Sequence, residues 1–155
     1  MTNLKLILER LKEMTPEEAR KATEGILDKN KTNYYFVSKE NHDDKILYPR
    51  VPKNRIKCED SITPRICVSQ SINGCLTAIE PHSVGEVLYV HECESDDVIQ
   101  PTLDQVPDRC FTGETWITAP TKMTLFMKII TTGCIDSEFD TMHNAVYNFK
   151  QIDFD

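Results

Sequence analysis

The sequence predicts an α+β fold in which a helical hairpin precedes a mostly antiparallel sheet. Apolar residues recur at helical spacing within the first 30 residues. From Asn33 onward, β-branched and aromatic runs alternate with Pro, Gly and Asn, which is typical of strands joined by turns. A single further helical pattern follows Ser71. We therefore expect two parts, a helical arm over residues 1–30 and an α+β domain over residues 33–155.

Two consecutive helices are predicted in the arm. The first covers residues 4–13, where one apolar stripe is formed by Leu4, Ile7, Leu8, Leu11 and Met14. Thr15 then precedes Pro16 and stands three residues before Glu18, the arrangement of a helix N-cap. The second helix should run to about residue 28. The arm either packs on the following domain or offers its apolar stripe to another chain.

The domain is predicted to contain five strands and one helix. The strands cover residues 34–38, 64–69, 87–93, 114–118 and 123–130. Ser71 should cap the helix, which ends at Glu80 and Pro81. Residues 39–61 contain two prolines and many charges, so they form a long irregular connection. The tail after Gly133 is polar, with apolar residues that could dock it, namely Phe139, Met142, Val146, Tyr147 and Phe149.

The charge of the chain bears on its partners. With 25 acidic and 18 basic residues, the net charge is -7, so a phosphate backbone is repelled and direct nucleic-acid binding is not expected. An acidic surface fits a basic protein partner, although solubility alone explains the same charge. No apolar stretch approaches the roughly 18 residues of a membrane span, so we expect no membrane contact and a cytoplasmic location. No pattern specifies an oligomeric state.

The sequence lacks the motifs that several kinds of site require. No secretion signal is visible in the sequence, so we expect the six cysteines to be buried thiols and not disulfides. No Cys pair has metal-ligand spacing and the four histidines are dispersed, so no zinc site is expected. The glycine-rich phosphate-binding motifs and the nucleophile elbow of hydrolases are absent.

Two segments carry the remaining candidate residues. Ser69 and Ser71 bring hydroxyls to the start of a helix, where backbone N–H groups favour an anion or a carbonyl-rich ligand, but the same hydroxyls could simply cap the helix. Glu114 follows Gly113 directly and lies on the same face of its strand as Trp116. A carboxylate beside an aromatic ring could act as a base or stabilise developing positive charge. Alternatively, Glu114 pairs with Arg65 or Arg109.

Taken together, the order of these segments resembles the ADP-ribosyltransferase superfamily, particularly its small phage-encoded members that act as anti-CRISPR proteins. The resemblance covers residues 34–130. The family's first strand holds NAD through an aromatic residue, a His or Arg and a small hydroxyl residue, and Tyr35, Phe36 and Ser38 stand in that segment. Residues 66–79 are similar to the second motif, a strand that runs into a helix, and residues 88–97 to the strand and turn that follow. Residues 114–123 are similar to the last motif, in which a catalytic Glu begins a strand.

The resemblance implies an NAD-dependent mono-ADP-ribosyltransferase that modifies or inhibits a host defence protein in the host cytoplasm. Glu114 would be catalytic, while Tyr35, Phe36, Ser38, Ser69, Ser71 and Trp116 would surround NAD. Phe36 departs from the pattern because a phenyl ring cannot supply the hydrogen bond of His or Arg. Trp116 replaces the second Glu of arginine-modifying members, so the modified residue would be another type. The alternatives are a non-catalytic inhibitor that covers a basic host protein, and a binder of NAD-derived nucleotides without turnover.

Overall fold

The computed structural model describes residues 13–18, 21, 30–53, 59–79, 85–107, 109–139 and 145–153. Most of the predicted helical hairpin lies outside these residues. Its N-cap is present, because the Thr15 hydroxyl accepts a hydrogen bond from the Glu18 backbone N–H at 3.1 Å. Helical backbone follows directly at residues 16–18. The start of the second predicted helix is therefore confirmed, while the pairing of two helices remains a prediction.

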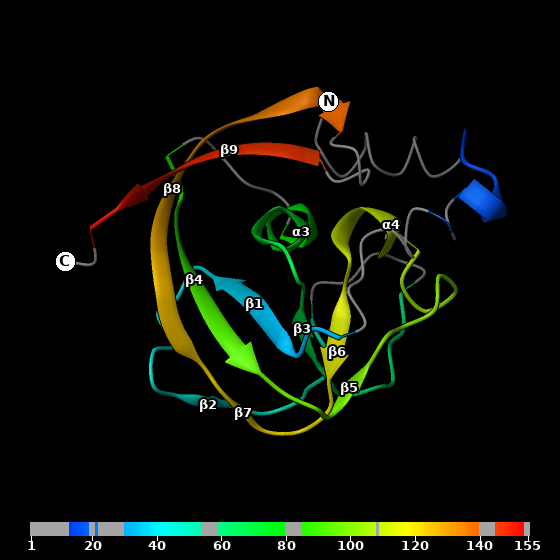
Figure 1. Cartoon of the computed structure of the whole chain (residues 1–155), viewed down its shortest axis with the longest axis horizontal. Helices are drawn as coiled ribbons and strands as arrows, with labels where there is room; N and C mark the ends of the chain where they lie inside the picture. Colours follow the sequence, from blue (N-terminus) through cyan, green and yellow to red (C-terminus); the bar gives the residue numbers. More distant parts are fainter. Residues whose placement is uncertain are drawn as a thin grey trace.

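The larger sheet is wholly antiparallel, as expected. Its spatial order is β1-β4-β8-β9, in which every neighbouring pair runs antiparallel. Figure 1 shows β4 and β8 curving along the left side of the molecule, with β1 nearer the centre and β9 across the top. The four strands are β1 (Asn33–Ser38), β4 (Val87–Glu94), β8 (Thr124–Phe139) and β9 (Ala145–Ile152).

A smaller antiparallel sheet of short strands stands beside the larger one (Figure 1). It has the order β3-β6-β5, with β3 (Ile66–Val68), β6 (Thr115–Ile117) and β5 (Val98–Ile99). A further pair closes the lower end, formed by β2 (Ile46–Leu47) and β7 (Thr121–Lys122).

The two sheets are joined by one backbone bridge. The Tyr35 N–H donates to the Ser69 carbonyl at 2.7 Å, and the Ser69 N–H donates to the Tyr35 carbonyl at 3.1 Å. A second bridge, between Arg50 and Arg65, holds residue 50 against the residue that precedes β3. The end of β3 is thereby fixed to the middle of β1.

Helix α3 (Ile72–Ala78) covers the larger sheet and lies between β1 and β9 (Figure 1). Its N-cap is Ser71, as predicted, whose hydroxyl accepts from the Gly74 N–H at 2.9 Å. The short helix α4 (Arg109–Thr112) packs against it. The core beneath α3 consists of Val37, Cys75, Leu76, Leu88, Val90 and Ile129.

A second core fills the space between the two sheets. Alternation along β1 sends Tyr34 into this core, whereas its neighbours Tyr35 and Val37 point toward α3. Leu47 and Val98 pack against it from the edges. Its buried members are Tyr34, Ile66, Val68, Cys93, Ile117 and Met123. Each sheet therefore has apolar side chains on the face that meets the other sheet.

The sequence analysis ended the last strand at residue 130 and predicted none in the tail. Strand β8 instead continues to Phe139, and Ala145–Ile152 forms β9. Phe149 does pack against the core beneath α3, as its apolar character suggested. The short elements β2, β5, β7 and α4 were also not predicted, because two to four residues show no periodicity. Among the described residues, no helix is long and apolar enough to cross a membrane.

Gly74→Ala should destabilise the protein, although alanine favours helices. A Cβ at this position would collide with the Thr112 carbonyl oxygen and the Ser69 hydroxyl, and it would lie 2.9 Å from the Ser71 hydroxyl. We expect a loss of about 1–3 kcal/mol in the free energy of unfolding, measured by urea denaturation. Ala78→Gly, at an exposed position of the same helix, is the control and should cost about 1 kcal/mol. A Gly74→Ala protein more stable than wild type would contradict the close packing of α3 on α4.

Candidate functional site

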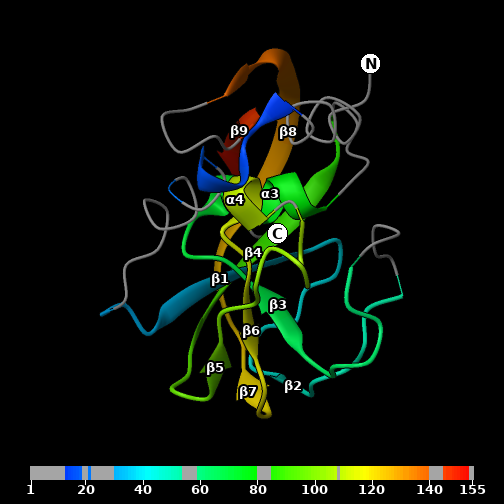
Figure 2. The same cartoon turned by 90° about the vertical axis from the view of Figure 1, so that its right-hand side faces the viewer.

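The strands of the smaller sheet, β3, β6 and β5, lie side by side in Figure 2, and their register places the candidate residues of two segments on one face. Cys67 pairs with Trp116 and Val68 with Thr115, so continuing the register by one residue sets Ser69 opposite Glu114. The bridge from Ser69 to Tyr35 extends this row to β1. Three residues predicted for the site thus occupy neighbouring positions, with Tyr35 in β1, Ser69 directly after β3 and Glu114 directly before β6.

Thr112 links Ser69 to Glu114 through both of its polar groups. Its carbonyl accepts the Ser69 hydroxyl at 2.8 Å, and its hydroxyl accepts the Glu114 backbone N–H at 3.1 Å. Gly113, between them, has a φ of 63°, a left-handed conformation that suits glycine. The turn from α4 into β6 therefore sets the position at which Glu114 enters the strand.

Glu114 is buried beside the indole of Trp116. Only 7% of Glu114 is exposed, and its Oε2 accepts a hydrogen bond from the Trp116 Nε1–H at 2.9 Å. Trp116 itself is fully buried. The expected pairing of a carboxylate with an aromatic ring is present, and the indole N–H supplies a fixed donor to the carboxylate.

Arg65 stacks on the ring of Trp116. Its guanidinium carbon lies 4.2 Å from the centroid of the Trp116 ring, close enough for a cation–π interaction. Its terminal nitrogens bond to the carboxylates of Glu59 at 3.2 Å and Asp60 at 3.3 Å. Arg65 is only 1% exposed, so these two carboxylates compensate a buried charge.

Arg109 lies on the backbone side of Glu114. Its Nε–H donates to the Glu114 carbonyl at 3.2 Å, while its Nη2 has no hydrogen-bond partner among the described residues. Burial lowers the pKa of Arg109, and the negative charge of Glu114 opposes that shift. The sequence analysis gave Arg109 as an alternative partner of Glu114. In the structure, Arg109 bonds to the Glu114 backbone carbonyl and interacts electrostatically with its carboxylate.

The hydroxyls of Ser69 and Ser71 both have structural roles. Ser71 caps α3, and Ser69 bridges to Thr112 and also accepts the Ser71 N–H at 3.3 Å. The ring of Tyr35 lies 5.9 Å from that of Phe126, with the Lys31 ammonium also 5.9 Å from its centroid. Ser69 is buried and Ser71 is committed to capping α3, so Tyr35 is the one of these three residues with a partly exposed side chain and no capping role.

The structure does not bring Phe36 and Ser38 together with Glu114. Both alternate with Tyr35 along β1, so they face the opposite side of the sheet. The Phe36 ring instead packs against two histidines, at centroid distances of 5.8 Å to His42 and 5.9 Å to His91. The Ser38 hydroxyl lies 3.2 Å from His42 Nε2.

His91 is held in one neutral tautomer. Its Nε2 accepts the backbone N–H of His42 at 2.9 Å, so the proton must reside on Nδ1, which donates to the Phe36 carbonyl at 3.1 Å. The side chain is completely buried. Burial lowers the pKa of His91, and the nearby His42 lowers it further, against the raising effects of the Phe36 carbonyl and Asp43.

The cysteines with described side chains are free thiols, as predicted. Burial raises the pKa of Cys75 and of Cys93 to about 12. Burial also raises the pKa of Cys67, and the negative charge of Glu114 acts in the same direction. These thiols therefore stay protonated at neutral pH and are poor nucleophiles. Within the same part of the chain, no three His, Cys, Asp or Glu side chains come together as a metal site.

Comparison with protein-family models, curated proteins and solved structures finds no match to this chain. The candidate site therefore rests on the geometry of the chain itself. That geometry adds Thr112, which sequence reasoning did not name as a site residue and which gives no signal in the sequence. Arg109, named from the sequence only as an alternative partner of Glu114, contacts the Glu114 carbonyl across a glycine-containing turn.

Trp116→Phe should weaken the fold by removing one donor from a buried carboxylate. Phenylalanine keeps an aromatic ring under Arg65 but cannot bond to Glu114, and it leaves a small cavity. We expect the free energy of unfolding to fall by about 2–4 kcal/mol in urea denaturation. Tyr48→Phe, at a side chain that is 67% exposed, should change it by less than about 0.5 kcal/mol. Equal effects of the two substitutions would contradict the proposed role of the indole N–H.

Stability should fall as the pH drops below about 6.5, the ordinary pKa of histidine. The unfolded chain binds a proton at His91 near that pH, whereas the folded chain resists it until a lower pH, so acid favours unfolding. His91→Gln should flatten this dependence between about pH 7 and pH 5 in thermal denaturation. An unchanged slope in that variant would show that other groups cause the dependence.

Proposed function

We propose that this protein is an NAD-dependent mono-ADP-ribosyltransferase of the phage-encoded type that modifies or inhibits a host defence protein. The observation that carries the proposal is that Ser69, directly after β3, is bridged to Tyr35 in β1 and is linked through Thr112 to Glu114, directly before β6. A carboxylate that begins a strand and is held by a fixed donor suits the stabilisation of positive charge in a transition state.

NAD would be the donor substrate in this reaction. The bond between the ribose C1′ and the nicotinamide nitrogen breaks, and nicotinamide leaves with the bonding electrons. A nucleophile of the target protein then forms a bond to C1′ and gives up its proton. Glu114 would stabilise the positive charge that develops on the ribose. The Arg109 Nη2, which has no partner in the part of the chain that the structure describes, fits a ligand that carries hydrogen-bond acceptors.

The remaining predicted ligand contacts divide into two groups. Tyr35 is the better candidate for seating the nicotinamide ring, because the Ser69 hydroxyl already donates to Thr112. Phe36 and Ser38 face the other side of the sheet, which disfavours a dinucleotide contact there. Trp116 occupies the position of the second Glu in arginine-modifying enzymes, and its indole holds Glu114. The target side chain is therefore expected to be a residue other than arginine.

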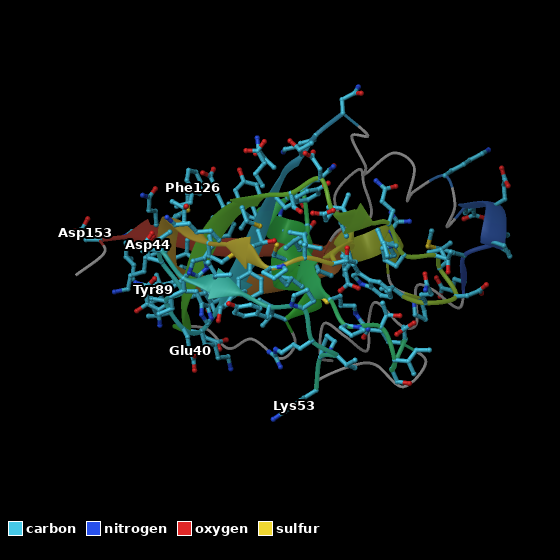
Figure 3. All side chains as sticks on the ribbon, turned by 90° about the horizontal axis from the view of Figure 1, so that it is seen from below. Glu40, Asp44, Lys53, Tyr89, Phe126 and Asp153 are labelled. Atoms are coloured by element: carbon cyan, nitrogen blue, oxygen red, sulfur yellow. The ribbon has the colours of Figure 1, made fainter. Side chains whose placement is uncertain are left out.

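A second candidate function is a non-catalytic module that covers a basic host protein. It is favoured by the acidic side chains at the surface, since Figure 3 shows Glu40, Asp44 and Asp153 at the periphery of the molecule. Further exposed carboxylates lie at the end of β4 and in the turn after it, at Glu94, Asp96 and Asp97. The structural hydrogen bonds of Ser69 and Ser71 also agree with this function. Capture of an NAD-derived nucleotide without turnover would use the same centre as the transferase.

Glu114→Gln should reduce ADP-ribosyl transfer by about a hundredfold or more, because it removes the negative charge at the reaction centre. Glutamine keeps an acceptor for the Trp116 N–H, so the fold should persist. Transfer is measured with labelled NAD and a host lysate. Glu92→Gln, at an exposed carboxylate on β4, is the control and should retain wild-type transfer.

The same assay separates the candidate functions. No transfer by wild type would reject the transferase. A complex with a lysate protein that weakens as salt rises would then support the binding module, because screening weakens contacts between charged surfaces. A rise in melting temperature with ADP-ribose, without transfer, would instead support nucleotide capture.

A further inference from the structure

Residues 45–53 form an extended segment at the lower end of the molecule, and the fold holds its backbone at two points (Figure 1). At its start, β2 pairs with β7. Farther along, the Arg50 N–H donates to the Arg65 carbonyl at 3.1 Å, and the Arg65 N–H donates to the Arg50 carbonyl at 2.9 Å. Pro49 and Pro52 restrict the backbone next to this bridge. The segment therefore has a defined shape before any partner binds, which lowers the entropy cost of binding.

Apolar side chains lie on both faces of the 45–53 segment, although only one face meets the core. Leu47 packs against the core between the sheets. Ile46 and Tyr48 alternate with it and point the other way, with exposed fractions of 54% and 67%. Outward positions of a strand normally hold polar residues, because an apolar side chain left in water gains nothing from folding. Two such residues on one face indicate a surface that a partner covers.

Uncompensated positive charge surrounds these two side chains. Lys45, Arg50 and Lys53 are exposed, and within the described part of the chain none of their side chains has a hydrogen-bond or ion-pair partner. Figure 3 shows Lys53 projecting from the edge of the molecule. The carboxylate of Asp44, directly before the segment, is bound by Lys122 Nζ at 2.6 Å. The segment is thus a basic surface on a chain whose net charge is -7.

The charge pattern favours a protein over a nucleic acid as the partner. A nucleic acid would carry its phosphate backbone past the segment and along the acidic remainder of the chain, where it is repelled. A protein segment can place its carboxylates at the three cations alone, and it can supply an apolar side chain for Ile46 and Tyr48. Tyr and Arg are also residue types that contribute strongly to protein–protein interfaces.

We propose that residues 45–53 are a docking surface for an acidic segment of a partner protein. Carboxylates of the partner pair with the three cations, while an apolar side chain of the partner covers Ile46 and Tyr48. This surface goes beyond the proposed function, because none of its side chains belongs to the centre at Glu114. It also gives the chain a basic contact surface in addition to its acidic one.

Selection from a displayed library of random peptides, with the full chain as bait, tests the surface. Wild type should enrich peptides that are rich in Asp and Glu and carry an aromatic or aliphatic residue. An enriched peptide should shift the amide NMR signals of residues 45–53, and added salt should weaken its binding. Tyr48→Ser should raise its Kd about tenfold or more, and Arg50→Gln combined with Lys53→Gln about fivefold or more.

The matched controls replace an exposed apolar residue and an exposed lysine on other strands. Ile99→Ser, on β5, and Lys150→Gln, on β9, should leave the Kd within about twofold of wild type. Because the side chain of Tyr48 is exposed, its replacement should leave the fold intact, which circular dichroism checks. If a variant does not fold, the signal changes in wild type decide the question.

Four results would overturn the proposal. They are enrichment of no peptide, enrichment of peptides without carboxylates, signal changes confined to residues outside 45–53, and an equal effect of Ile99→Ser and Tyr48→Ser. Tighter binding of a DNA or RNA oligonucleotide through residues 45–53 would replace the acidic protein by a nucleic acid.

The transfer assay is scored separately from the peptide selection. Acidic peptides that bind residues 45–53, with no transfer activity, would retain the docking surface and reject the transferase. Transfer that depends on Glu114, with no enriched acidic peptide, would retain the transferase and reject the docking surface.

Discussion

The backbone bridge between Tyr35 and Ser69 is the contact on which the rest of the structure depends. It joins the two sheets, and it places Ser69 where its hydroxyl reaches the Thr112 carbonyl. Ser71, two residues later, begins α3, so one short segment connects a strand, a helix and the turn before Glu114. The close approach of α3 to that turn is what excludes a side chain at Gly74. The candidate site is thus a consequence of how the sheets meet.

The smaller sheet combines an apolar face with a charged one. Ile66 and Ile117 pack into the core between the sheets, while the alternate side chains of the same strands form the centre of Arg65, Trp116 and Glu114. Burying an ionised group costs free energy unless the group is paired and hydrogen-bonded. Trp116 helps to stabilise two such groups, the Arg65 guanidinium and the Glu114 carboxylate. Its ring faces one guanidinium and its N–H holds a carboxylate. A single aromatic side chain therefore contacts a positive group on its ring face and a negative group at its N–H.

Much of the fold could be predicted from residue patterns, whereas the site could be predicted only in part. β1, β4 and the cap of α3 follow from alternation and from Ser71, which are local properties of the chain. Glu114 and Trp116 share a face because side chains two residues apart on a strand must do so. The burial of Arg109, whose Nη2 has no partner among the described residues, depends on packing between distant segments, which no local pattern encodes. β9 was missed because its polar residues obscured the period of a strand.

The long hairpin of β8 and β9 has a consequence for folding. The 16 residues of β8 span about 50 Å when extended, well beyond the other strands, and its partner β9 returns over α3 (Figure 1). Helix α3 is therefore enclosed between β1 and the last described strand of the chain. Phe149 reaches the core beneath α3 only after β9 has been synthesised on the ribosome. Folding of that core is expected to be slow and to follow the synthesis of β9, with its apolar surface in need of protection until then.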